Sequence, residues 1–192
     1  MESVSAIILA GGQSRRMGQD KALIDFRGRP IIAHVIDTLR GLSSDVIVVS
    51  NRSGVYDSFG ARVVSDYEPP AGPLGGIAAG LSAARRDLTI VVACDMPFLN
   101  SRLLRYLIEQ AVDADAAVMQ IEGKFEPLHA VYRRACLTAI NQHLTAGDRR
   151  VISFYADVRL RSIPEADWRT IDPDGRSTAN LNTPDDLSLL IG

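Results

Sequence analysis

The chain has 192 residues, of which 46% are hydrophobic and 23% are charged, and its formal net charge is −2. This length and composition exclude a disordered chain and suit one domain, residues 1–192, with a sizeable core. The small net charge gives no general attraction to nucleic acid or to anionic membranes. The sequence has no run of 18 apolar residues and no secretory signal pattern. We therefore expect a cytoplasmic protein that neither spans a membrane nor binds nucleic acid.

The first predicted strand, Ser5 to Ala10, runs into a segment suited to holding phosphates. Two glycines and three cations follow it: Gly11, Gly12, Arg15, Arg16 and Lys21. Glycines let the backbone turn sharply and bring its N–H groups close to an anion, while the cations neutralise charge further out. The segment contains neither GxGxxG nor GxxxxGK[ST], so the mechanisms of those motifs do not apply. We expect a small anionic ligand at this loop, with Lys21 as a point charge on a polyphosphate.

Hydrophobic periodicity predicts an alternation of strands and helices along the rest of the chain. Further strands are expected at Val46 to Val49, Arg62 to Ser65, Leu88 to Ala93, Ala116 to Ile121, Glu126 to Tyr132 and Arg159 to Ile163. Helices are expected from about Pro30 to Leu42, Gly76 to Ala84, after a cap at Ser101, Ala135 to Leu144, Val151 to Ala156, and from Thr183. The segment 67–76, rich in proline and glycine, is expected to be irregular. This order predicts an α/β three-layer sandwich with a mostly parallel central sheet.

Four of the predicted strands end at residues that could contact a ligand: a phosphate-binding loop, an amide and two carboxylates. These are the glycine pair, Asn51, Asp66 and Asp95. Ligands of open α/β sheets bind outside the carboxyl ends of the strands, so these residues are expected at one edge. Mg²⁺ takes one or two carboxylates together with phosphate oxygens, which makes Asp95 the candidate metal ligand. Asp66 is either a second ligand or a contact to ribose or substrate, and Asn51 is either a turn former or a ligand contact.

Cysteine and histidine chemistry is not indicated. Cys94 and Cys136 form no CxxC pair, and Cys94 is expected to be a packed core thiol. The three histidines have no set of partners that suggests a triad or a metal site. Nucleophilic catalysis by the protein is therefore rejected.

Five motifs together resemble the molybdenum cofactor guanylyltransferase family. They are LAGGQSRRMGQDKAL from Leu9, GPLGGI from Gly72, CDMPF from Cys94, EPLHAVYR from Glu126 and NLNTPDD from Asn180. The matches run in order over nearly the whole chain. The resemblance implies a Rossmann-like nucleotidyltransferase fold and the transfer of GMP from GTP to the phosphate of molybdopterin, with release of pyrophosphate. It also implies GTP and molybdopterin as substrates, Mg²⁺ as cofactor, and transient contact with cofactor-insertion or molybdoenzyme proteins.

The same resemblance assigns roles to individual residues. For the nucleotide it implies Leu9, Ala10, Gly11, Gly12, Lys21, Asn51, Asp66 and Asp95. It assigns catalysis to Lys21, Asp95 and Arg15, and it assigns the binding of Mg²⁺ to Asp95. The pterin side of the cleft is assigned to Asn180, Asn182 and Arg149, although a basic helix end explains Arg149 equally well.

Three alternatives stay open. The nearest is a related enzyme, either a molybdopterin cytidylyltransferase or a sugar-phosphate nucleotidyltransferase. LAGG with Gly12 resembles the guanylyl enzymes, whereas LAAG is usual in the cytidylyl enzymes and in many sugar relatives. A non-catalytic nucleotide or cofactor carrier is the second alternative, and the presence of both Lys21 and Asp95 speaks against it. A dinucleotide-binding oxidoreductase is the third, and it lacks its GxGxxG motif.

Overall fold

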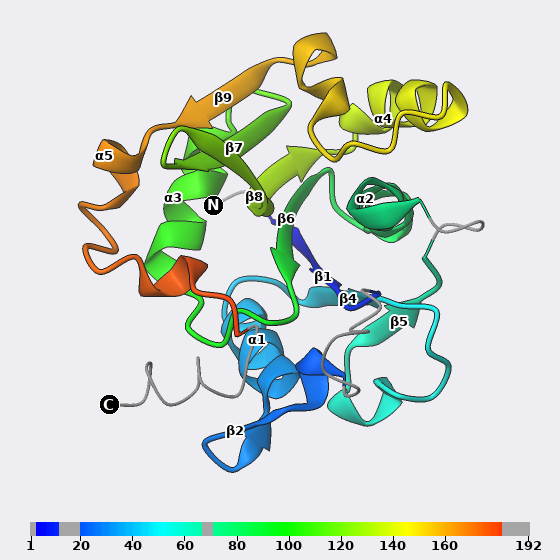
Figure 1. Cartoon of the computed structure of the whole chain (residues 1–192), viewed down its shortest axis with the longest axis vertical. Helices are drawn as coiled ribbons and strands as arrows, with labels where there is room; N and C mark the ends of the chain where they lie inside the picture. The colour runs from blue at the N-terminus through cyan, green and yellow to red at the C-terminus, as the bar shows by residue number, and fades with distance from the viewer. Residues whose placement is uncertain (1–2, 12–19, 67–70, 182–192) are drawn as a thin grey trace.

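The fold is built on a seven-stranded sheet, seen in a computed structural model that describes residues 3–11, 20–66 and 71–181 (Figure 1). The strand order is β5-β4-β1-β6-β8-β7-β9. β8 is antiparallel to both of its neighbours, and the other paired strands are parallel. The strands are β1 Ser5–Leu9, β4 Asp45–Val49, β5 Arg62–Val64, β6 Leu88–Ala93, β7 Ala116–Ile121, β8 Lys124–Arg133 and β9 Leu160–Ile163. β2 Asp25–Phe26 and β3 Arg29–Pro30 form a separate antiparallel pair.

Helices cover both faces of the sheet. α1 Ile31–Arg40, α3 Ser101–Gln110 and α5 Glu165–Trp168 pack on one face, and α2 Gly72–Ala83 and α4 Cys136–Thr145 pack on the other. Short 3₁₀ helices complete the described chain: η1 Lys21–Leu23, η2 Asp57–Phe59, η3 Ser153–Asp157 and η4 Arg176–Thr178. The mostly parallel α/β sandwich predicted from the sequence is confirmed. No helix in the described ranges is long and apolar enough to cross a bilayer.

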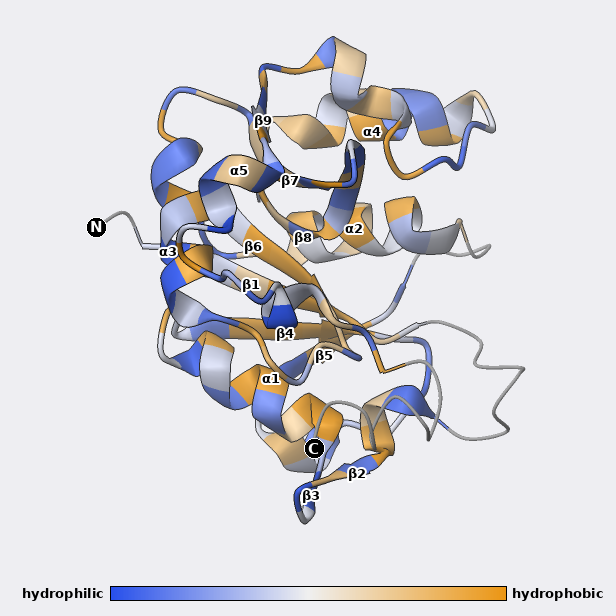
Figure 2. Ribbon diagram, turned by 60° about the vertical axis from the view of Figure 1, so that its left-hand side comes forward, coloured by the Kyte–Doolittle hydropathy of each residue, from blue (hydrophilic) through white to orange (hydrophobic). Residues whose placement is uncertain are grey.

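The central strands are apolar because both of their faces are covered. Along β1, Ile8 packs into the core beneath α1 and α3, whereas Ile7 packs into the core beneath α2. Figure 2 shows these hydrophobic strands enclosed between the helical layers. The residues 46–49 of β4 are therefore all apolar rather than alternating with polar ones, as expected for a strand in a parallel sheet.

Two helix starts differ from the expectations. α2 begins at Gly72 rather than near Gly76, with a proline in its first turn, so much of the segment expected to be irregular is helical. Pro73 fits there because the first helical N–H groups have no partner within the helix. α3 is capped by Asn100 rather than Ser101, and the Asn100 side chain accepts hydrogen bonds from the backbone N–H groups of Arg102 and Leu103.

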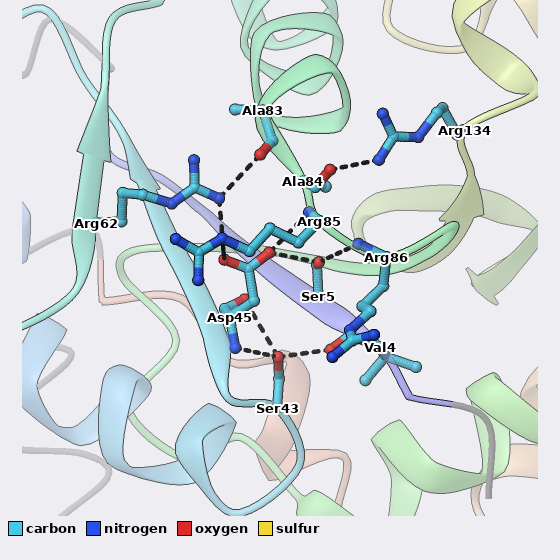
Figure 3. A network of polar contacts seen from close by, with 10 residues as sticks. All are labelled: Val4, Ser5, Ser43, Asp45, Arg62, Ala83, Ala84, Arg85, Arg86 and Arg134. Atoms are coloured by element: carbon cyan, nitrogen blue, oxygen red, sulfur yellow. Dashed lines mark hydrogen bonds and ion pairs between the residues drawn. The ribbon is translucent and has the colours of Figure 1, made fainter.

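Asp45 anchors the amino-terminal edge of the sheet (Figure 3). Its buried carboxylate accepts hydrogen bonds from Ser5 Oγ at 2.6 Å, Arg62 Nη2 at 2.9 Å and the Arg85 backbone N–H at 2.9 Å. Burial alone would raise the pKa of Asp45, but these hydrogen bonds hold it below its usual value. The network ties β1, β4, β5 and the end of α2 together at the edge away from the site described next.

Candidate active site

A pocket of about 400 Å³ opens at the carboxyl ends of the parallel strands. Its lining comes from the ends of β1, β4, β5 and β6, the first turns of α2, the strand β8 and the segments around Lys21 and Asn180. The lining residues are Leu9, Ala10, Gly11, Asp20, Lys21, Val49, Asp66, Gly72, Pro73, Gly76, Ala93, Cys94, Asp95, Met96, Glu126, Leu128 and Asn180. This is the edge at which the sequence predicted a site.

Lys21 and Asp95 face each other in this pocket. Lys21 Nζ lies 3.6 Å from Asp95 Oδ2, and the two side chains are 25% and 16% exposed. Burial raises the pKa of Asp95, and the nearby Lys21 ammonium offsets part of that rise. Burial also raises the pKa of the neighbouring Cys94 thiol, which is consistent with a packed thiol rather than a nucleophile.

Asp20 fixes the position of Lys21. Its Oδ1 accepts the Ala22 backbone N–H at 3.1 Å, which caps η1. Its Oδ2 accepts the hydroxyl of the buried Tyr56 at 2.6 Å and also pairs with Arg52. Lys21 therefore lies at the start of the short helix η1, and the contacts of Asp20 hold this start against the segment after β4. The sequence analysis missed Asp20, although an aspartate directly before a helical turn is a capping signal.

Gly11 and Asp66 lie in close contact across the pocket. A Cβ atom added to Gly11 would stand 2.9 Å from Asp66 Oδ2, so a larger residue would displace the carboxylate or the loop. The Asp66 backbone N–H donates to Asn51 Oδ1 at 2.8 Å. Asn51 is exposed and is absent from the pocket lining, so its observed contact is with the backbone of Asp66. Its role toward a nucleotide stays a prediction.

The first turn of α2 gives the pocket an anion-binding element that the sequence analysis did not foresee. Gly72, Pro73 and Gly76 all line the pocket. The free N–H groups at the start of a helix and the positive end of its dipole favour phosphate oxygens. Gly76 also allows close packing, because an added Cβ would meet Leu9 Cδ2 at 3.1 Å. The glycine-rich motif could have indicated this start, since proline is common in the first turn of a helix.

Three further residues line the pocket on the side of Asp95. Glu126 and Leu128 come from β8, and Asn180 comes from the segment after η4. Burial raises the pKa of Glu126, and the nearby Asp95 charge adds to that effect. The Leu181 backbone N–H donates to the Asp95 carbonyl at 3.0 Å, which holds the Asn180 segment against the end of β6.

The remaining predicted site residues are not part of the described pocket lining. Gly12, Arg15 and Asn182 are outside the described residues, as is the predicted helix start at Thr183. Arg149 is exposed in the turn after α4 and is absent from the pocket lining. Its contact with a pterin phosphate stays a prediction.

The described lining fits a divalent cation bound together with phosphate. It contains four carboxylates, Asp20, Asp66, Asp95 and Glu126, and one lysine. Within the described ranges no group of three or more His, Cys, Asp or Glu side chains could hold a metal ion by itself. An ion at Asp95 would therefore complete its coordination with ligand oxygens and water, which is how Mg²⁺ usually binds.

A mostly parallel sheet whose carboxyl edge carries a lysine, a half-buried carboxylate and a helix start is typical of enzymes that bind nucleotides. Residues 6–161 match the family model described as a MobA-like NTP transferase domain, and the chain belongs to this family. It is accordingly a nucleotidyltransferase.

Proteins with similar sequences align with this chain over nearly its full length. A probable molybdenum cofactor guanylyltransferase of Pelotomaculum thermopropionicum is 40% identical over 97% of this chain and 91% of its own. The molybdenum cofactor guanylyltransferase of Desulfosudis oleivorans is 38% identical over 97% and 94%. The crystal structure of molybdopterin-guanine dinucleotide biosynthesis protein A from Archaeoglobus fulgidus has a TM-score of 0.81 and 25% identity, covering 96% and 95% of the two chains.

Proposed function

We propose that the enzyme transfers GMP from GTP to the terminal phosphate of molybdopterin, releasing pyrophosphate and forming molybdopterin guanine dinucleotide. The pairing of Lys21 with the half-buried Asp95, 3.6 Å apart in the pocket, carries this proposal. This pair places a cation that can bind phosphate next to a carboxylate that can bind a metal ion. The guanylyltransferase names of relatives that are 38% and 40% identical support the choice of reaction.

The reaction needs alignment more than proton transfer. The acceptor phosphate is already ionised at neutral pH, so no strong general base is required. The protein has to hold this phosphate in line with the α-phosphorus and stabilise the charge on the departing pyrophosphate. Lys21 and the first N–H groups of α2 would bind phosphate oxygens, and Asp20 keeps the Lys21 segment in place. Such fixed donors are effective because the pocket does not have to reorganise during the reaction.

Asp95 is the residue we assign to Mg²⁺, with Asp66 as the other carboxylate on the nucleotide side. When bound, the ion neutralises charge on the polyphosphate and orients it. Leu9, Ala10 and Gly11 would meet the guanine nucleotide at the end of β1, where they line the pocket beside Asp66. A side chain at Gly11 would displace the Asp66 carboxylate, because an added Cβ would lie 2.9 Å from Asp66 Oδ2.

Guanine selectivity is assigned to the second glycine of the loop. This assignment rests on the LAGG motif, in which a glycine at position 12 in place of an alanine would admit the larger purine. We further propose one cytoplasmic domain over residues 1–192 that works on GTP and molybdopterin and makes transient contact with proteins that receive the product.

Nucleotide choice and product identity test this proposal together. Purified enzyme is incubated anaerobically with molybdopterin, Mg²⁺ and either GTP or CTP, and pyrophosphate and the dinucleotide are quantified. We expect stoichiometric pyrophosphate and guanine dinucleotide with GTP and at least about a tenfold lower rate with CTP. A preference for CTP, or pyrophosphate release that does not depend on molybdopterin, would contradict the proposal.

A further inference from the structure

Glu126 belongs to a motif that the proposed mechanism leaves unused. The pairing of β6 with β8 runs from Leu88 opposite Arg133 to Val92 opposite His129. β8 bulges between Glu126 and Ala130 where it pairs with β7, so Glu126 lies beyond this regular register. Glu126 and Asp95 both line the pocket, and they lie close enough for the Asp95 charge to help raise the pKa of Glu126. Glu126 therefore stands beside the reaction centre, on the side away from β1 and β5.

The Glu126 carboxylate lacks a cationic partner within the described part of the chain. Its hydrogen bond there is a long one, from the Leu128 backbone N–H to Oε1 at 3.3 Å. Lys21 lies against Asp95 instead. A half-buried carboxylate with so little compensation costs free energy unless a ligand supplies donors. We therefore expect a bound ligand to supply the hydrogen-bond donors for the Glu126 carboxylate.

The side-chain oxygen of Asn180, Oδ1, is buried and also lacks a hydrogen-bond donor among the described residues. Asn180 lines the same pocket, and its segment is tied to the Asp95 carbonyl through Leu181. The Glu126 carboxylate on β8 and the Asn180 side-chain oxygen can therefore both accept hydrogen bonds from N–H groups of a ligand. Leu128 and Met96 add apolar surface to the same lining.

We infer that Glu126 recognises the N–H donors of the acceptor's pterin ring system and so determines specificity for the acceptor. This inference rests on the proposed function. A pterin has an amino group next to a ring N–H, and this pair of donors matches the two oxygens of one carboxylate. Its flat rings suit the apolar surface of Leu128 and Met96. Guanine presents a similar edge, but its expected place is beside Leu9 and Gly11, at the end of β1.

The test separates acceptor binding from nucleotide binding. Glu126→Gln and Glu126→Ala are compared with wild type and with Glu122→Gln, a matched control at an exposed glutamate in the turn before β8. Anaerobic equilibrium dialysis gives the affinity for molybdopterin, and calorimetry gives the affinity for GTP with Mg²⁺. Steady-state assays give KM for molybdopterin and kcat. Circular dichroism checks that each variant is folded.

We expect both Glu126 variants to bind molybdopterin at least about tenfold more weakly, because a charge-assisted hydrogen bond is lost. KM for molybdopterin should rise by a similar factor, whereas GTP affinity and the Glu122→Gln control stay within about twofold of wild type. Unchanged molybdopterin affinity would overturn the inference. Loss of Mg²⁺-dependent GTP affinity with normal molybdopterin binding would also overturn it, and would make Glu126 a metal ligand. Wild-type enzyme that binds molybdopterin without transferring GMP would refute the proposed function alone.

Discussion

His129 should make the protein acid-sensitive. It lies on β8 opposite Val92, it is fully buried, and neither ring nitrogen has a hydrogen-bond partner among the described residues. Burial lowers its pKa from the usual 6.5 to about 4, and the charge of Asp172 opposes this only in part. The folded protein therefore keeps His129 neutral at a pH where the unfolded chain binds a proton.

The sign and size of the effect follow from proton linkage. Between pH 6.5 and 4 the unfolded state binds more protons than the folded state, so stability falls as the pH is lowered through this window and is unaffected above it. With these two pKa values, the loss is about 2 kcal/mol at pH 5 and about 3 kcal/mol at pH 4. Carboxyls with a raised pKa, such as Asp95, contribute in the opposite direction. The effect is therefore measured as the difference between a variant and wild type.

His129→Leu replaces the ring with an apolar side chain that does not titrate. We expect it to gain about 2 kcal/mol over wild type on going from pH 7.5 to pH 5. Urea unfolding followed by circular dichroism at each pH measures this difference. Thr89→Val is the matched control, because Thr89 Oγ1 is also buried without a partner among the described residues but does not titrate. If the His129→Leu difference is as independent of pH as that of Thr89→Val, the reasoning is wrong.

Three further predictions concern packing and phosphate binding. Gly80→Ala should lower the free energy of unfolding by about 1–2 kcal/mol. The added Cβ would lie 2.6 Å from Ile7 Cδ1, and this overpacking outweighs the gain in helix propensity. Urea unfolding that shows a more stable variant would contradict this prediction. Lys21→Ala should weaken GTP binding in calorimetry by about tenfold or more while circular dichroism is unchanged, because a direct charge on phosphate is lost; equal affinity would make Lys21 a surface lysine. Gly11→Ala should weaken GTP binding as well, through displacement of Asp66, and wild-type affinity would show that this close contact is unimportant.

Much of the fold could be predicted because its strands carry a strong signal. The strands around Ile7, Ile47 and Val91 are apolar on both faces, and this excludes most architectures other than a parallel sheet between helices. Once the sheet is parallel, the residues after its strands must meet at one edge. The position of Asp66 and Asp95 in one pocket follows from this rule, without any knowledge of the loops between them.

Other features depend on contacts that no local pattern encodes. Asp20 holds Lys21 through Tyr56, which is 36 residues away in the sequence. Glu126 reaches the pocket because β8 runs antiparallel beside β6, and a parallel neighbour in that position would present its residues in the opposite order. The start of α2 at Gly72 could not be recognised because glycine and proline are typical of loops. Within the helix, close packing on Leu9 favours glycine at Gly76.

The fate of the GTP phosphates tests the central claim most directly. The enzyme is supplied with molybdopterin, Mg²⁺ and GTP labelled at either the α or the γ phosphate, and Asp95→Ala is run beside wild type. We expect wild type to place the α label in the dinucleotide and the γ label in pyrophosphate. Asp95→Ala should remain folded and lose activity by about a hundredfold or more, because the charge on the polyphosphate is no longer neutralised. Transfer of the γ label to molybdopterin, or normal turnover by Asp95→Ala, would contradict the account.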